Sequence, residues 1–113
     1  DIRVRALLAR LETRPLEELA RAAVTRFSGQ AKEVKAPKSP PRAPFPGAKQ
    51  AFRVRLSGWL AGSGSVVQEE VLLVEHGNGW IYEFQVTTHA GAARAFAKEL
   101  KAFWNSIRVR ETP

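Results

Sequence analysis

The chain has 113 residues, of which 44% are hydrophobic and 26% are charged, and its formal net charge is +7. This length and composition predict one globular domain over residues 1–113 with a single hydrophobic core, and they exclude a disordered chain. The absence of cysteine excludes disulfides and thiolate metal sites, and no apolar run approaches the roughly 20 residues that a membrane-spanning helix needs.

The first elements predicted are a strand and a helix. Apolar residues alternate with arginines in 1–8, which is typical of a strand. Residues 14–28 predict a helix with Thr13 as its N-cap, Pro15 in its first turn and Gly29 as its stop. The apolar face of this helix consists of residues at helical spacing: Leu16, Leu19, Ala20, Ala23 and Phe27.

A proline-rich segment follows a short edge strand predicted at 30–36. Five of the seven prolines lie in 36–47, and this density excludes a helix or a central strand. We expect an extended loop with polyproline II character, in which Phe45 packs under the domain. The run from Pro37 to Arg42 matches the P-x-x-P-x-R pattern of recognition peptides. Short proline patterns are common by chance, so we interpret the loop as a stiff connector.

The stretch 51–88 predicts a three-stranded antiparallel meander, with strands at 51–57, 66–75 and 80–88. A Gly-rich turn at 61–64 joins the first two strands, and Asn78-Gly79, a strong hairpin signal, joins the last two. Centring the first turn near 62–63 pairs Val54 with Val71, Phe52 with Leu73 and Arg55 with Glu70. Centring the second turn on Asn78-Gly79 pairs Leu73 with Phe84 and Val71 with Val86.

These two registers put all the large apolar side chains of the meander on one face. The other face then carries a charged group and a smaller apolar group: Arg53, Arg55, Glu70, Glu83, Leu72, Val74 and Ile81. We expect the strongly apolar face to receive the main helix packing and the other face to be half covered.

Residues 90–105 predict a second helix that packs on the apolar face of the meander, and 106–110 predict a last short strand with Ile107 inward. The apolar stripe of the helix consists of Ala93, Phe96, Ala97, Leu100, Phe103 and Trp104. Its solvent-exposed face consists of Arg94, Lys98, Glu99 and Lys101.

The basic charge is concentrated in the first half of the chain. Residues 1–50 carry eleven basic and five acidic side chains, whereas 51–113 carry seven and six. The excess favours an anionic partner, although a solvated basic surface is the simpler interpretation. The triplet Arg-Val-Arg occurs at 3–5, 53–55 and 108–110, and it would form a basic stripe if the three strands were neighbours.

No catalytic constellation is present in the sequence. Asp1 is the only aspartate, which argues against a Ser-His-Asp triad. Glu69 and Glu70 point to opposite faces of a strand, and His76 and His89 belong to no ligand-spaced cluster and are expected at the surface. We therefore predict no enzymatic activity, no cofactor and no metal site.

The remaining candidates for function are basic and aromatic side chains. Trp59 follows Gly58 and interrupts the alternation of its strand, so we expect a bulge that turns it outward. The candidate partner-binding residues are Arg53, Arg55, Trp59, Lys38 and Arg42.

The order of elements and the runs ETRPLEELARAAVTRF, EEVLLVEHGNGWIYEFQVTT and FAKELKAFWNSIRV resemble the PsbP-like proteins. This family includes the extrinsic photosystem II protein, the Ran-binding nuclear import factor and bacterial envelope proteins of the DcrB type. The resemblance implies an α+β fold in which helices sandwich an antiparallel sheet, and a role in binding or assembly instead of catalysis. The chain departs from the family at its front, where the family has a further strand and an aromatic-containing segment.

Two hypotheses about function follow from these features, and a third, a small-ligand pocket between the sheet and a helix, has no sequence feature for or against it. The first is a non-enzymatic binding or assembly module with a protein partner. The second is an anion-binding protein, for nucleic acid or acidic lipid, that uses the basic first half. The absence of methionine indicates a fragment or a processed protein, and we favour a bacterial envelope or secreted location over the cytoplasm. A composition rich in Ala, Arg, Leu, Pro and Glu suits a thermostable protein.

Overall fold

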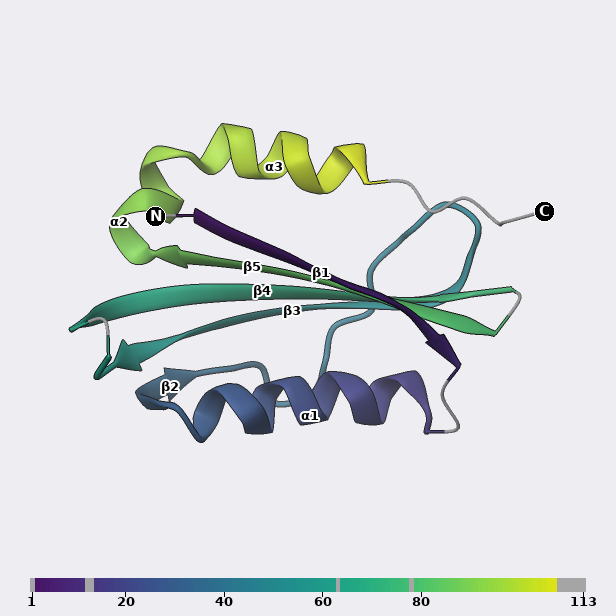
Figure 1. Cartoon of the computed structure of the whole chain (residues 1–113), viewed down its shortest axis with the longest axis horizontal. Coiled ribbons are helices and arrows are strands. Elements are labelled where there is room, and N and C mark those ends of the chain that lie inside the picture. The colour runs from purple at the N-terminus through teal and green to yellow at the C-terminus, as the bar shows by residue number, and fades with distance from the viewer. Residues whose placement is uncertain (1, 12–13, 63, 78, 108–113) are drawn as a thin grey trace.

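The computed structural model describes residues 2–11, 14–62, 64–77 and 79–107. Five antiparallel strands form one sheet in the order β1-β5-β4-β3-β2. The elements are β1 (Ile2–Leu11), α1 (Leu16–Ser28), β2 (Ala31–Lys35), β3 (Ala48–Leu60), β4 (Ser65–His76), β5 (Trp80–His89), α2 (Ala90–Ala95) and α3 (Ala97–Ser106). Figure 1 shows α1 on one side of the sheet and α2 and α3 on the other. The predicted α+β class, with a central meander between helices, is confirmed.

Helix α1 forms where its apolar spacing predicts it, with small differences at its two ends. Pro15 precedes the helix, and its carbonyl accepts hydrogen bonds from the amides of Glu18 and Leu19. Gly29 ends the helix in a right-handed conformation, with φ −72°, instead of the left-handed one that its position suggested. Thr13, the predicted N-cap, lies outside the described residues. The glycine therefore stops the helix without using its conformational freedom.

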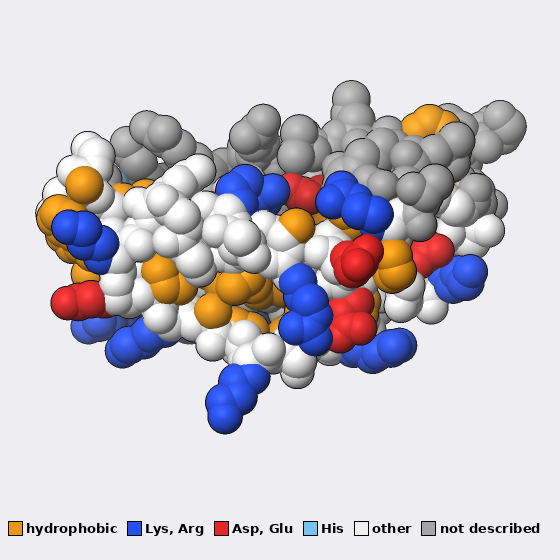
Figure 2. All heavy atoms as spheres, turned by 90° about the horizontal axis from the view of Figure 1, so that it is seen from below, with side chains coloured by type: hydrophobic (Ala, Val, Ile, Leu, Met, Phe, Trp, Pro, Cys, Tyr) orange, Lys and Arg blue, Asp and Glu red, His pale blue; other side chains and the backbone are white. Residues whose placement is uncertain are grey.

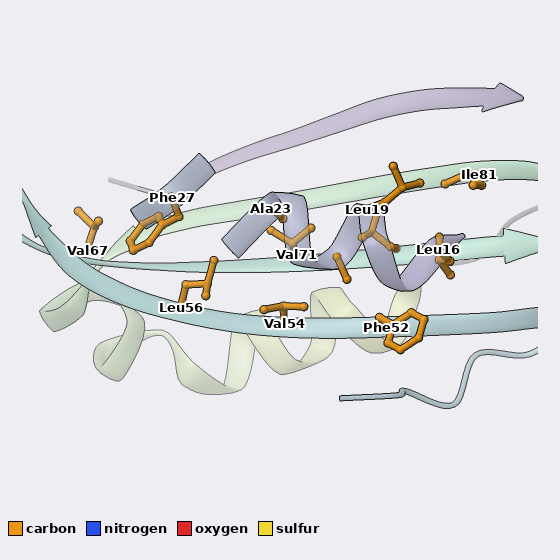
Figure 3. Close-up of a cluster of buried hydrophobic side chains, with 12 residues drawn as sticks. Leu16, Leu19, Ala23, Phe27, Phe52, Val54, Leu56, Val67, Val71 and Ile81 are labelled. Atoms are coloured by element: carbon orange, nitrogen blue, oxygen red, sulfur yellow. The ribbon is translucent and has the colours of Figure 1, made fainter. Parts of the chain in front are cut away.

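The apolar face of α1 packs on the sheet and forms the larger of two buried clusters, which we call the α1-side core (Figure 3). The sheet contributes inward side chains that alternate along β3, β4 and β5. Its members are Leu16, Leu19, Ala20, Ala23, Phe27, Phe52, Val54, Leu56, Val67, Val71, Leu73 and Ile81.

A second cluster, the α3-side core, fills the space between the opposite face of the sheet and α3. Ile107 is buried in it, as predicted, and Phe45 of the proline loop packs against its edge. The predicted strand at 106–110 is wrong at its start, because α3 continues to Ser106, and 108–110 lie outside the described residues. The cluster consists of Ala51, Leu72, Val74, Val86, Trp104 and Ile107.

The register of the first hairpin is confirmed. Phe52 pairs with Leu73, Val54 with Val71 and Arg55 with Glu70. This pairing runs without a shift from Gln50 to Leu60, so β3 has no bulge against β4 near Gly58 and Trp59; the register shift at this level lies in the β2–β3 ladder, between Lys32 and Lys35.

The register of the second hairpin differs from the prediction by one residue. Phe84 lies opposite Leu72 instead of Leu73, and Gln85 instead of Val86 lies opposite Val71. Strand β4 ends at His76 and β5 begins at Trp80, so an odd number of residues, three, separates the strands, whereas a turn centred between Asn78 and Gly79 needs an even number. The amide of Gly79 donates to the carbonyl of His76 at 2.9 Å, and Gly79 has φ +87°. A turn followed by a left-handed glycine is typical of a three-residue hairpin loop.

A shift of one residue turns a whole strand over. Tyr82 and Phe84 therefore lie against the α3-side core, and Ile81 and Glu83 lie on the α1 side. The prediction that all large apolar side chains share one face is wrong. Both faces of the sheet are apolar because each is covered by a helix, and α1, not 90–105, covers the face of Phe52.

Exchanging the two residues at the start of β5 for alanine tests this register. Ile81 is 2% exposed in the α1-side core, whereas Trp80 is 39% exposed. We expect Ile81→Ala to lower the free energy of unfolding by about 3 kcal/mol, and Trp80→Ala by about 1 kcal/mol or less. Urea denaturation of the two variants measures both values. A larger loss for Trp80→Ala than for Ile81→Ala would mean that Trp80 is the buried residue and that the predicted pairing of Leu73 with Phe84 is correct.

The helix predicted at 90–105 is broken in two at Phe96. This residue leaves the helical conformation, with φ −109° and ψ 27°, and is 47% exposed. Ala93 before the break and Trp104 after it are both buried. Phe96 falls on the apolar stripe predicted for this helix, so the helical periodicity of the sequence did not predict the break.

The strand order separates two of the three Arg-Val-Arg triplets, so these two do not form a common basic stripe. β1 pairs with β5, and β5 and β4 separate it from β3. The triplets at 3–5 and 53–55 are therefore not neighbours, and 108–110 lie outside the described residues. At the other edge, β2 and the proline loop both run beside β3.

Candidate binding groove

A groove of about 660 Å³ lies between the α2–α3 side and the sheet. Strand alternation explains its floor, because alternate residues of β3, β4 and β5 point to this face. The floor includes Arg53, Arg55, Ser57, Gln68, Glu70 and Thr88. The helices supply a wall that includes Ala93, Arg94, Ala97, Leu100, Lys101 and Trp104.

A carboxylate shared by two arginines lies at the centre of the floor. Nη2 of Arg53 donates to Oε2 of Glu70 at 3.0 Å. Nε and Nη2 of Arg55 donate to Oε1 of Glu70 at 3.1 and 3.0 Å. The Glu70 side chain is 8% exposed, whereas Arg53 is 35% and Arg55 67% exposed. Glu70 thus orients both guanidinium groups and leaves much of Arg55 open to solvent.

The guanidinium of Arg53 lies over the ring of Trp104, with 5.1 Å between its Cζ and the ring centroid. This cation–π contact joins α3 to the floor. Trp104 is only 7% exposed. One face of its ring is therefore covered by Arg53 and is not available to stack on a ligand.

The groove carries an excess of positive charge. Four basic side chains and one acidic side chain line it, which gives a net charge of about +3. The members are Arg53, Arg55, Arg94, Lys101 and Glu70. Arg94 of α2 and Lys101 of α3 are both exposed, and both line the groove although they lie on different helices.

On the opposite side of the molecule, several described basic side chains lie beside acidic ones. Figure 2 shows such neighbouring blue and red side chains on this side, together with basic side chains that stand alone. Arg21 pairs with Glu17 at 3.2 Å, and Arg26 approaches Glu83 at 3.7 Å. The basic excess of the first half of the chain is thus partly neutralised where α1 meets solvent.

A second hollow, of about 560 Å³, adjoins the groove at the outer edge of β3. We call it the notch. It shares five residues with the groove floor: Arg53, Arg55, Ser57, Gln68 and Glu70. Its other lining residues include Lys35, Pro37 and Pro41, from the end of β2 and the proline loop.

The five predicted site residues lie in different places. Arg53 and Arg55 come together in the groove. Lys38 and Arg42 are exposed on the proline loop and do not line the groove; Arg42 lies over the ring of Phe52, 5.7 Å from its centroid. Trp59 is half-buried, and Nζ of Lys32 lies 6.0 Å from its ring centroid.

Two groove residues, Arg94 and Lys101, escaped the sequence analysis, which assigned both to the solvent-exposed face of a helix. Lys101 precedes the buried Trp104 by three residues in α3, which is a signal that it borders the packed face, whereas Arg94 lies before the break at Phe96 and has no such signal.

The α1 side of the sheet contains two buried glutamates, Glu69 and Glu83, which are 7% and 4% exposed. Burial raises the pKa of the Glu69 carboxyl above its ordinary value. Hydrogen bonds from Gln85 and Thr87 and the charge of Arg26 oppose this rise, and the charge of Glu83 adds to it. The folded state therefore favours the protonated form of Glu69.

This raised pKa predicts how a Glu69→Gln variant depends on pH. Above the folded-state pKa the wild type carries a buried charge that disfavours folding; the penalty begins to shrink as the pH falls through that pKa and is gone below the pKa of the unfolded chain. We expect Glu69→Gln to be more stable than the wild type at neutral pH, and the gain to shrink on acidification. Thermal melts between neutral pH and pH of about 4 measure the trend. Glu17→Gln, in the exposed pair on α1, is the control, and an equal gain there would refute the interpretation.

The histidines are not the surface groups that the sequence suggested. His76 is buried, with its ring edge-on to Tyr82 at a centroid distance of 6.4 Å. Nδ1 of His89 lies 2.8 Å from the hydroxyl of Ser65. Within the described ranges no group of three or more His, Cys, Asp or Glu residues is placed to hold a metal ion. Nor is any helix in that part of the chain long and apolar enough to cross a membrane.

Comparison with known proteins gives no relative for this chain: no family model matches it, and no curated protein or solved structure matches it significantly.

Proposed function

We propose that the chain is a non-enzymatic binding module that holds an anionic partner in the groove between α2–α3 and the sheet. The observation that carries the proposal is the charge of this groove, where four basic side chains meet a single glutamate. Exposed cations that converge on one concave surface attract anions from solution and retain them by charge-assisted hydrogen bonds.

The proposed anion site does not lie on the proline loop (residues 36–47). Lys38 and Arg42 are exposed there, but they do not line the groove. The basic side chains that converge come from β3 and from the α2–α3 side, in the second half of the chain.

Kinship with the PsbP-like proteins is a separate part of the proposal. Its support is the order of elements in the sequence and the placing of helices on both faces of an antiparallel sheet. A role in binding or assembly is what this kinship implies.

Reversing single charges tests the proposal. We expect Arg55→Glu and Lys101→Glu each to weaken the binding of an anionic probe by about tenfold or more at low ionic strength. The reason is that each change turns an attractive contact in the groove into a repulsive one. The probes are a glutamate-rich peptide, an oligodeoxythymidylate and phosphatidylglycerol vesicles, and binding is followed by fluorescence anisotropy or by co-sedimentation with the vesicles.

Lys38→Glu is the matched control, because it makes the same charge change on the exposed loop outside the groove. Equal losses for all three variants would mean that net charge alone drives binding. No binding of any probe would refute the proposal.

A further inference from the structure

We propose that the ligand is an acidic, extended peptide segment of a partner protein, which lies in the groove and pairs with the exposed backbone of Arg55 in the notch. This inference rests on the proposed function and specifies the chemical class of the partner.

The backbone of β3 provides the first reason. The amide of Arg53 donates to the carbonyl of Pro41 at 3.1 Å, so the N–H and C=O of Arg53 point to the outer edge of the sheet. Residues two apart in a strand point the same way, so Arg55 also presents its N–H and C=O to this edge. Arg55 lines the notch, and Pro37 and Pro41 line it from the side of the proline loop.

Two prolines explain why the edge stays open there. The pair Lys35–Ser57 is the last of the β2–β3 ladder, and continuing its register would place Pro37 opposite Arg55. Proline has no N–H, so Pro37 cannot donate to the Arg55 carbonyl, and Pro41 cannot donate to that of Arg53. Among the described residues no backbone hydrogen bond joins the proline loop to Arg55.

Arg55, between the paired residues Arg53 and Ser57, thus offers one backbone donor and one acceptor beside a hollow, and a peptide that adds to a strand edge uses such groups. A peptide backbone has the donors and acceptors that match them, whereas a lipid or a nucleic acid has no such repeating amide. Basic side chains surround the opening: Lys35, Arg53 and Arg55 line the notch, and Arg94 and Lys101 lie further along the groove. The charge therefore selects a peptide with acidic side chains.

The residues that line the groove do not suit a nucleic acid or an acidic lipid, which are the two other classes of anionic ligand. Single-stranded nucleic acid binds by stacking bases on exposed aromatic rings. Trp104 is the aromatic side chain that lines the groove, and it is buried beneath Arg53. An acyl chain needs a continuous apolar channel, but in this groove polar side chains such as Ser57, Gln68 and Thr88 lie between apolar ones such as Val86 and Leu100.

The test is a titration of the whole chain with a peptide of about ten residues in which glutamate and serine alternate, a length of roughly 33 Å when extended. The control peptide carries glutamine in place of every glutamate. We expect the acidic peptide to bind at least about tenfold more tightly than the control peptide, than an oligodeoxythymidylate of equal charge and than phosphatidylglycerol vesicles. Arg94→Glu should weaken this binding by about tenfold, and Lys38→Glu should change it by less than about twofold.

Amide hydrogen exchange tests the strand pairing separately. The Arg55 amide should exchange rapidly in the free protein and become protected when the acidic peptide binds. Peptide binding without this protection would overturn the strand pairing. If the oligonucleotide or the vesicles bind through Arg55 and Lys101 more tightly than the peptide, the peptide inference fails and the anion-binding proposal stands. If no probe binds, both fail.

Discussion

Replacing Leu73 with alanine is expected to lower the free energy of unfolding by about 3 kcal/mol or more. Leu73 is 0% exposed and lies in β4, the central strand of the sheet. The change removes three buried carbon atoms and leaves a cavity. Neighbouring strands on both sides and α1 above hold the walls of this cavity apart, so the site has little freedom to collapse.

Chemical denaturation followed by tryptophan fluorescence measures this loss. Val66→Ala is the matched control, because Val66 lies in the same strand but is 47% exposed, and we expect it to cost less than about 0.5 kcal/mol. A small loss for Leu73→Ala would mean that α1 does not cover this face, and it would contradict the α1-side core.

Local patterns in the sequence were enough to predict α1 and the first hairpin. The five apolar residues predicted for one face of α1 are all buried. In the first hairpin, apolar residues alternate on both strands, and only one register pairs Phe52 with Leu73 and Val54 with Val71.

The second hairpin was predictable only in part, because the choice of register depended on the assumption that one sheet face is wet. The parity within β5 was predicted correctly, but the turn was centred half a residue too late, between Asn78 and Gly79 instead of on residue 78. With helices on both faces, burying Ile81 or burying Phe84 satisfies the same hydrophobic pattern. The alternation alone therefore does not decide which side of β5 faces α1.

The candidate site shows the same limit. Arg53 and Arg55 were predicted as binding residues because they share a strand face, which alternation reveals. Their neighbours Arg94 and Lys101 come close only when α2 and α3 fold over the sheet. The proline density predicted an extended loop, but the position of Pro37 opposite Arg55 follows from the pairing of Lys35 with Ser57. Contacts between distant segments depend on tertiary packing, which local patterns do not specify.

Replacing Gly58 with valine is expected to lower the free energy of unfolding by about 3 kcal/mol. Gly58 lies in β3 where α1 ends and β2 begins. A Cβ atom there would lie 3.0 Å from Cβ of Ala31, 3.2 Å from the carbonyl oxygen of Lys32 and 3.2 Å from Cε2 of Phe27. Two of these neighbours are a backbone atom and a Cβ atom, which move only if β2 moves. The glycine thus allows α1 and β2 to approach β3 closely.

A variant pair separates this close approach from the general cost of replacing a glycine. Gly62 lies in the turn before β4 with no atom within 4 Å of an added Cβ, so Gly62→Val should cost less than about 1 kcal/mol. Combining Ala31→Gly with Gly58→Ala should cost less than the sum of the two single changes, because Ala31 supplies the nearest contact. Equal losses for Gly58→Val and Gly62→Val, or strict additivity in the double variant, would show that β2 and α1 do not crowd β3 at this position.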